Sequence, residues 1–199
     1  MQQADINIKA SKTSLLSTIE EKEKCVKDMN ELNKRLLSEK KDFDKYSAMA
    51  LQMKGTCLES NMNSQLKETI NKYQLTCSLA SDILKKSENI FDQHFEFEQN
   101  VKKSKEWIEE AWKVIRGNGN SQGKSKEGLH GQLDKLCQLI ESQEGQSYAH
   151  TAIDWGKKAC RNTRSDGKDK MNTQLKDLQA VWEKLLKRYL LLRFQLRQT

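Results

Sequence analysis

The chain of 199 residues contains no proline at all. Proline lacks a backbone N–H and interrupts helices, so its absence favours long helices over an architecture rich in turns. Glycine, the other common breaker, occurs eight times after residue 116 but only at Gly55 before it. Charged residues make up 32% of the chain and aromatic residues 7%, a balance typical of helical bundles. The sequence therefore predicts an all-α protein.

Apolar residues recur three and four positions apart along most of the chain, which is the spacing of an amphipathic helix with one buried stripe. The pattern is interrupted by short clusters of glycine, asparagine and serine. These interruptions leave four segments that we expect to be helical: 12–53, 61–116, 128–160 and 169–197. In the first and third segments the stripe consists of Cys25, Met29, Leu32 and Leu36, and of Leu129, Leu133, Leu136 and Ile140.

The segment 61–116 carries two apolar stripes, which meet within residues 91–97. The stripe residues Phe91, His94 and Phe97 are separated by two successive spacings of three, whereas spacings of three and four alternate on either side. This turns the stripe to a new face of the helix. Because the segment contains neither glycine nor proline, its backbone can remain helical through this change. One helix would then serve two cores. The sequence predicts two domains that meet inside this helix, residues 1–93 and 94–199.

An internal repeat supports the two domains. MNSQLKE (62–68) recurs as MNTQLKD (171–177) at an offset of 109 residues, which aligns Tyr73 with Trp182. The apolar stripes of the first and third segments align at an offset of only 104 residues. This difference predicts a longer connection between the last two helices of the second unit, and we assign that connection to the basic stretch 157–170.

A three-helix unit of this length, with a continuous helix joining neighbouring units, resembles the spectrin repeat. Phe97 stands ten residues before Trp107 and Ile108, as in the first helix of that repeat, and LQAVWEKLL (178–186) carries the tryptophan of its third helix at Trp182. We expect Trp107 and Trp182 to pack together. The predicted structural core of the second repeat contains Phe97, Trp107, Ile108, Trp182 and Leu185.

The resemblance covers the second unit completely and the first unit only in part. Residues 1–10 are too few for a full first helix, and Tyr73 stands where the second unit has Trp182. The expected fold is therefore a tandem of spectrin-like three-helix bundles that share a continuous linker helix. Its first bundle has an incomplete first helix.

Within the spectrin-repeat family, the irregular sequence and the free cysteines are more similar to the nesprins, giant proteins of the nuclear envelope, than to spectrin or dystrophin. This resemblance implies a structural spacer and protein-docking module of a giant cytoskeletal linker. It also implies a location at the cytoplasmic face of the nuclear envelope. The expected partner is an actin-organising protein such as a formin.

No group of residues predicts catalysis, a cofactor or a metal. Gly123-Lys124-Ser125 forms half of a phosphate-binding loop, but Asn118 stands where the first glycine belongs and a helix-like segment precedes the loop. The five cysteines are scattered, with no Cys-x-x-Cys pair, which favours a reducing, intracellular compartment over disulfides or a zinc site. His94 lies on an apolar stripe, where a packed histidine is commoner than a metal ligand. We expect no enzyme and no small-molecule substrate.

The net charge of +7 resides in residues 154–199, which hold twelve Lys and Arg against five Asp and Glu. Within this range Trp155 is surrounded in sequence by basic residues. Tryptophan beside arginine is a common composition of binding hot spots, and the longer connection would keep the group off the bundle. The candidate partner-binding residues are Trp155, Lys157, Lys158, Arg161 and Arg164.

Other interpretations of these features remain open. The basic stretch is also typical of a solvated loop, and Trp112 and Trp155 of partial burial at the edges of a bundle. An alternative function is a basic helical module that binds anionic membrane or nucleic acid through residues 154–199. No aromatic residue alternates with the charges of 157–170 to stack a base, so we expect neither nucleic acid nor membrane contact. A rival docking surface is the first repeat, with Met49, Met53 and Met62 as adaptable contacts.

Overall fold

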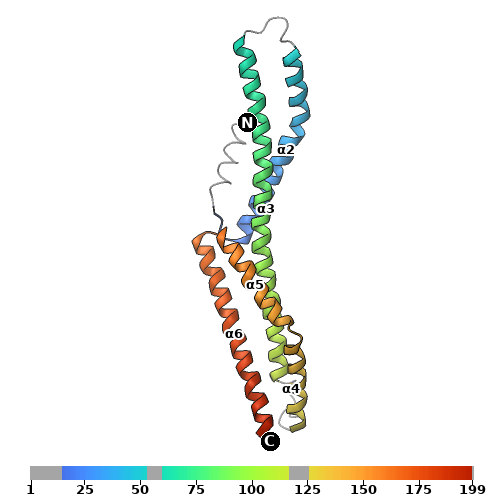
Figure 1. Ribbon diagram of the computed structural model, residues 1–199, viewed down its shortest axis with the longest axis vertical. Helices are drawn as coiled ribbons and strands as arrows, with labels where there is room; N and C mark the ends of the chain where they lie inside the picture. The colour runs from blue at the N-terminus through green and yellow to red at the C-terminus, as the bar shows by residue number, and fades with distance from the viewer. Residues whose placement is uncertain (1–14, 53–59, 117–125, 199) are drawn as a thin grey trace. The chain divides into compact units, whose positions relative to one another are not determined.

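The computed structural model describes residues 15–52, 60–116 and 126–198, and these residues form helices and short connections without a strand. The helices, labelled as in Figure 1, are α2 (Ile19–Gln52), α3 (Ser60–Arg116), α4 (Lys126–Glu141), α5 (Glu144–Arg161) and α6 (Ser165–Gln198). The prediction of an all-α helical bundle protein is confirmed.

Helix α3 is 57 residues long and continues without a break through residues 91–97, as the sequence predicts. Two polar residues that follow this region bond to the helix itself. The Asn100 side chain donates to the Glu96 carbonyl oxygen at 2.7 Å, and the Ser104 hydroxyl donates to the Asn100 carbonyl oxygen at 2.8 Å. Both polar side chains thus find a hydrogen-bond partner within α3, and the helix remains continuous.

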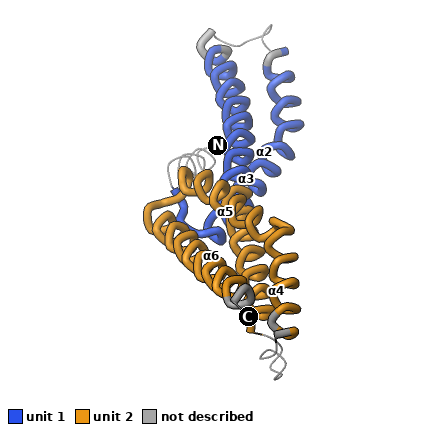
Figure 2. Tube along the Cα trace, turned by 60° about the horizontal axis from the view of Figure 1, so that its bottom comes forward, with its two compact units in different colours: residues 1–91 blue, residues 92–199 orange. Residues whose placement is uncertain are grey.

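The chain divides into two compact units, residues 1–91 and 92–199, which Figure 2 shows in different colours. The division falls inside α3, so this helix contributes its first part to one core and its second part to the other. The sequence placed the boundary between residues 93 and 94.

In unit 1, α2 lies beside the first part of α3 (Figures 1 and 2). Tyr73 occupies the centre of the contact: its ring stacks on Phe43 with centroids 4.0 Å apart, and its hydroxyl donates to the Leu36 carbonyl oxygen at 2.7 Å. Burial raises the pKa of Tyr73 to about 12. The buried apolar residues of this core are Met29, Leu36, Tyr73, Ala80, Ile83 and Leu84.

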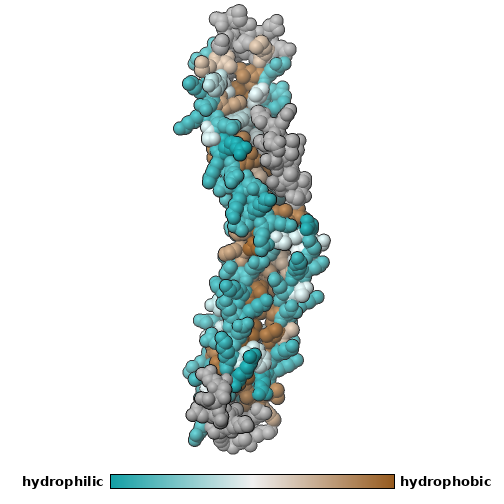
Figure 3. Space-filling view, turned by 180° about the vertical axis from the view of Figure 1, so that it is seen from behind, coloured by the Kyte–Doolittle hydropathy of each residue, from teal (hydrophilic) through white to brown (hydrophobic). Residues whose placement is uncertain are grey.

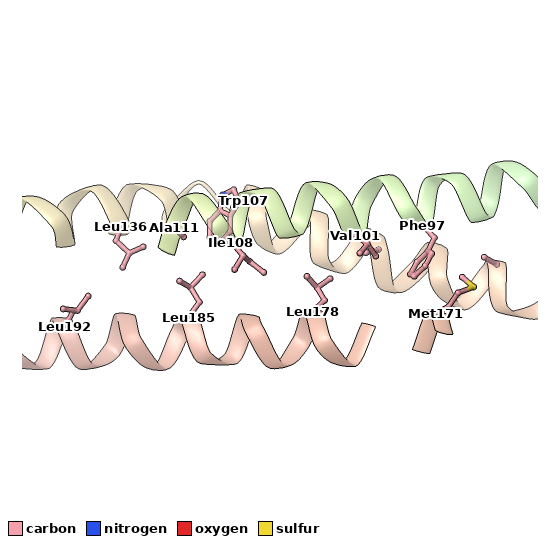
Figure 4. Packing of buried hydrophobic residues seen from close by; sticks show 12 residues of the cluster. Phe97, Val101, Trp107, Ile108, Ala111, Leu136, Met171, Leu178, Leu185 and Leu192 are labelled. Atoms are coloured by element: carbon pink, nitrogen blue, oxygen red, sulfur yellow. The ribbon is translucent and has the colours of Figure 1, made fainter. Parts of the chain in front are cut away.

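In unit 2, α6 packs against α4 and α5, and its apolar side chains face the second part of α3 (Figure 4). Figure 4 shows Met171, Leu178, Leu185 and Leu192, each seven residues from the next, pointing from α6 towards the residues of α3 and α4. The α3 residues at this contact include Phe97, Val101, Trp107, Ile108 and Ala111. The indole rings of Trp107 and Trp182 lie 5.1 Å apart at 31°.

The prediction of one helix over 128–160 is wrong, because the chain bends at Ser142 and Gln143 between α4 and α5. Gln143 has a φ of 57°, a left-handed conformation that ends α4 and that side chains other than glycine rarely adopt. Gly145 follows in the first turn of α5, and a Cβ added there would overlap the Trp107 ring. The bend carries no glycine or proline at its own position, so the sequence gives little sign of it.

The prediction of a long connection over 157–170 is also wrong. Helix α5 includes this stretch as far as Arg161 and α6 begins at Ser165, so the connection has three residues, 162–164. It is closely packed: the Thr163 hydroxyl is buried and donates to the Ala159 carbonyl oxygen at 2.6 Å. The Asn162 side chain donates to Gln93 Oε1 at 3.3 Å.

Glu96→Pro tests the continuous helix. Proline at this position removes a helical hydrogen bond in the middle of α3 and should lower the free energy of unfolding by about 3 kcal/mol or more. Urea unfolding followed by circular dichroism measures the change. Glu96→Ala is the control: it also removes the half-buried carboxylate that accepts from Asn100 Nδ2 at 3.4 Å but keeps the helical hydrogen bond, and it should cost no more than about 1.5 kcal/mol. Equal stability of the two variants would contradict an unbroken helix at this point.

Gly145→Ala tests the contact between the bend and Trp107. The added methyl group overlaps a buried ring, so the variant should lose about 1–3 kcal/mol of stability. Gly131→Ala in α4 is the matched control, because among the described residues no side chain and no other helix lies within 4 Å of the added methyl group. That substitution should stabilise the chain by about 0.5–1 kcal/mol through helix propensity. If both variants are stabilised, α5 does not approach Trp107 as described.

Candidate docking surfaces

Small residues on α5 let this helix approach the core of unit 2 closely. Its buried residues are Gly145, Ala152, Gly156 and Ala159. A Cβ added to Gly156 would lie 3.1 Å from Leu175 and 3.2 Å from Phe97. The neighbouring residue, Trp155, is consequently half-buried and packs against the core. The expectation that a long connection keeps Trp155 off the bundle is therefore wrong.

The structure brings only part of the predicted basic group to Trp155. The Lys158 ammonium lies 4.1 Å from the centre of the Trp155 ring, a cation–π contact. Arg164 instead makes two hydrogen bonds of 2.9 Å to the Asp166 carboxylate. Lys157 and Arg161 are exposed on α5. The group is thus a basic surface of a folded helix with its tryptophan partly covered, and its role in docking stays a prediction.

His94 and Cys160 both lie in contact with residues of unit 2. His94 is buried, with Nε2 3.6 Å from Glu98 Oε1, and Cys160 Sγ lies 4.0 Å from Met171 Sδ. No cluster of three or more His, Cys, Asp or Glu that could bind a metal occurs among the described residues. The glycine-rich stretch 117–125 and Met53 lie outside those residues, but the segment before the stretch is the end of α3 and not a strand.

A groove between α3 and α6 was not predicted. Buried Ile108 and Leu178 line it together with Trp112 and Val181, and the exposed Glu109 and Asp177 border it. The hollow holds about 210 Å³, which suits a side chain of a partner better than a cofactor. A second hollow continues it along α3 and shares Lys105 and Glu109 with it. The sequence predicts partial burial of Trp112 at the edge of a bundle, but the groove depends on α6, whose groove residues begin at Asp177.

The outer face of α6 near its end carries an exposed apolar patch. Leu190, Leu191 and Phe194 are 58%, 53% and 58% exposed, and they border one surface hollow together with Lys187 and Arg193. Most of the molecular face shown in Figure 3 is hydrophilic, with hydrophobic residues in separate patches. Leu190, Leu191 and Phe194 place three large exposed apolar side chains within five positions of one helix, and such groups mark interaction sites.

None of the helices in the described ranges combines the length and the apolar composition that crossing a bilayer requires.

Comparison with known proteins shows similarity to a short part of a giant protein. The chain is 43% identical over 189 residues, or 94% of its length, to "Muscle-specific protein 300 kDa" of Drosophila melanogaster. These residues span only 2% of that relative's length. No model of a protein family matches the chain, and no solved structure matches it. The chain is thus similar to one segment of a giant, muscle-specific protein.

Replacing Lys158 tests the contact over Trp155. Lys158→Gln removes the cation from the ring and should cost about 0.5–1 kcal/mol of unfolding free energy, the value of a partly exposed cation–π pair. Lys157→Gln, one residue away and exposed, should leave stability within about 0.5 kcal/mol of the unsubstituted chain. Urea unfolding followed by tryptophan fluorescence measures both. Equal effects of the two substitutions would show that Lys158 adds nothing at the ring.

Proposed function

We propose that the chain is a structural spacer and protein-docking module of a giant cytoskeletal linker. The observation that carries this proposal is helix α3, whose 57 residues contribute to the cores of both units. At 1.5 Å per residue such a helix spans about 85 Å. Because no loop interrupts it, a load along the chain acts on a continuous helical backbone. Similarity to a segment of a giant, muscle-specific protein supports a mechanical role.

The proposed partner is an actin-organising protein, such as a formin, that presents an acidic surface. It would bind α5 at Trp155, Lys157, Lys158 and Arg161, with Arg164 beside them. Two features support this surface. The Trp155 ring is held in place by the core beneath it and Lys158 above it, so little side-chain entropy is lost on binding. The exposed cations would speed association with an acidic partner. By resemblance to nesprins, we place this linkage at the cytoplasmic face of the nuclear envelope.

Binding to a purified formin tests the proposal. Trp155→Ala should weaken binding by roughly 2 kcal/mol or more, the range of a hot-spot residue. Lys157→Glu with Arg161→Glu should chiefly lower the association rate, because both residues are exposed and the charges act before contact. Titration gives the affinity and stopped-flow mixing gives the rate.

Two controls separate recognition from folding. Lys135→Glu reverses an exposed charge on α4 and should not change binding. Urea unfolding of Trp155→Ala shows how much stability the half-buried ring contributes, and binding is measured where the variant is fully folded. Binding that is unaffected by Trp155→Ala and by the α5 charge reversals would refute this surface. Failure of the formin to bind at all would refute the proposed partner.

A second candidate function is binding to anionic membrane or nucleic acid through residues 154–199, which carry the net charge of +7. Its test is a salt titration with anionic vesicles and with duplex DNA. Contacts to phosphate release counterions, so binding through them falls steeply as salt rises. A protein interface anchored by Trp155 should be much less sensitive to salt.

A further inference from the structure

We propose that this chain self-associates through two different surfaces of unit 2. The apolar patch at the end of α6 in one copy binds the groove between α3 and α6 of another copy. The proposal rests on the exposure, the shape and the charge of these two surfaces, and it does not depend on the docking role of Trp155.

The α6 patch is exposed within this chain. By helical geometry Leu190 and Phe194 lie about 200° around the axis from Leu192, which is buried in the core of unit 2. These side chains therefore point away from the bundle and are more than half exposed. Their contact with one common hollow shows that they form a single surface with Lys187 and Arg193.

The α3–α6 groove has the properties of an acceptor for such a helix. Apolar side chains of Trp112, Leu178 and Val181 line it, and its volume of about 210 Å³ suits one large side chain such as Phe194. Grooves between two helices commonly bind the apolar face of a third helix. The second hollow extends this groove along α3 with a largely polar lining, so the acceptor surface is longer than a single side chain.

Charge favours binding of the α6 patch to the groove over binding of two α6 patches to each other. The residues that line the two hollows include four acidic and two basic side chains, namely Glu98, Glu106, Glu109 and Asp177 against Lys102 and Lys105. Residues 184–198 of α6 contain five basic and no acidic side chains. Two α6 ends would repel each other, whereas an α6 end and a groove attract. A second copy therefore supplies a partner with the complementary charge as well as the apolar anchor.

The two surfaces differ, so the contact is heterologous: each copy can use its groove for one neighbour and its α6 end for another. The association should accordingly continue beyond a dimer as concentration rises. The patch is small, so we expect weak association of the kind found for interfaces below about 1,200 Å². In a filament or bundle of linkers, such contacts would hold neighbouring chains side by side.

Sedimentation velocity of the full chain over a wide range of concentration tests the proposal. The unsubstituted chain should show a rising weight-average sedimentation coefficient. Phe194→Ala should weaken association at least about fivefold, as expected for an anchor residue. Two double variants reverse the charges: a groove variant, Glu109→Lys with Asp177→Lys, and an α6 variant, Lys187→Glu with Arg193→Glu. All four residues are exposed, and circular dichroism verifies the helical content of each variant.

Each charge variant alone should associate far more weakly, because the reversed residues then face charges of their own sign across the contact. The introduced lysines of the groove variant face Lys187 and Arg193, and the introduced glutamates of the α6 variant face Glu109 and Asp177. An equal mixture of the two variants should associate again, since the groove of one variant and the α6 end of the other are complementary. Lys86→Glu with Lys135→Glu is the matched control, which changes the charge as much as the α6 variant does at exposed residues elsewhere. It should associate like the unsubstituted chain.

Three results would overturn the proposal. The unsubstituted chain could remain monomeric at every concentration, or the charge variants could associate as well as it does. The mixture of the two charge variants could also fail to associate where the unsubstituted chain does. In that last case the charges matter for association, but the groove and the α6 end do not bind each other.

Discussion

Helix α3 has to bury apolar side chains in two different cores, and the rest of the structure depends on this requirement. Its first part supplies Tyr73, Ala80 and Ile83 to unit 1, and its second part supplies Phe97 and Ile108 to unit 2. The stripe changes face between them without a break in the backbone. A single glycine in this region of α3 would lower the cost of bending the helix, and a proline would end it. This region contains neither residue.

Trp107 imposes a second requirement within unit 2. Its ring packs on Trp182 and against the position of Gly145, so the first turn of α5 can lie there only without a side chain. The left-handed Gln143 redirects the chain two residues earlier. The bend between α4 and α5 and the close packing of Gly156 then bring α5 against the core along a row of small residues. One large side chain on α3 therefore helps to decide where a helix more than 35 residues later begins.

Periodicity and the lack of breakers were sufficient to predict the fold class and the unbroken α3, because both depend on local helix preference and on which residues are apolar. The bend at Gln143 could not be predicted in this way, since it arises from a contact between residues far apart in sequence. The three-residue connection after Arg161 was missed for a related reason. The polar and charged residues of 157–170 are typical of a loop, yet most of them lie on the solvated faces of α5 and α6.

The candidate surfaces likewise depend partly on local sequence and partly on contacts between residues far apart in the chain. Trp155 stood out in the sequence because of its charged neighbours, but a helix with several small residues carries it onto the core, where part of the ring is covered. Trp112 also has charged neighbours in the chain, among them Lys113 and Arg116, but only the packing of α6 makes it part of a groove. Exposure of a large side chain is thus decided by which helices flank it. The sequence around it mainly determines the charge of the surface. A docking residue in a helical bundle is recognised when both its exposure and the charge of the surface around it are known, as at the groove of unit 2 and the end of α6.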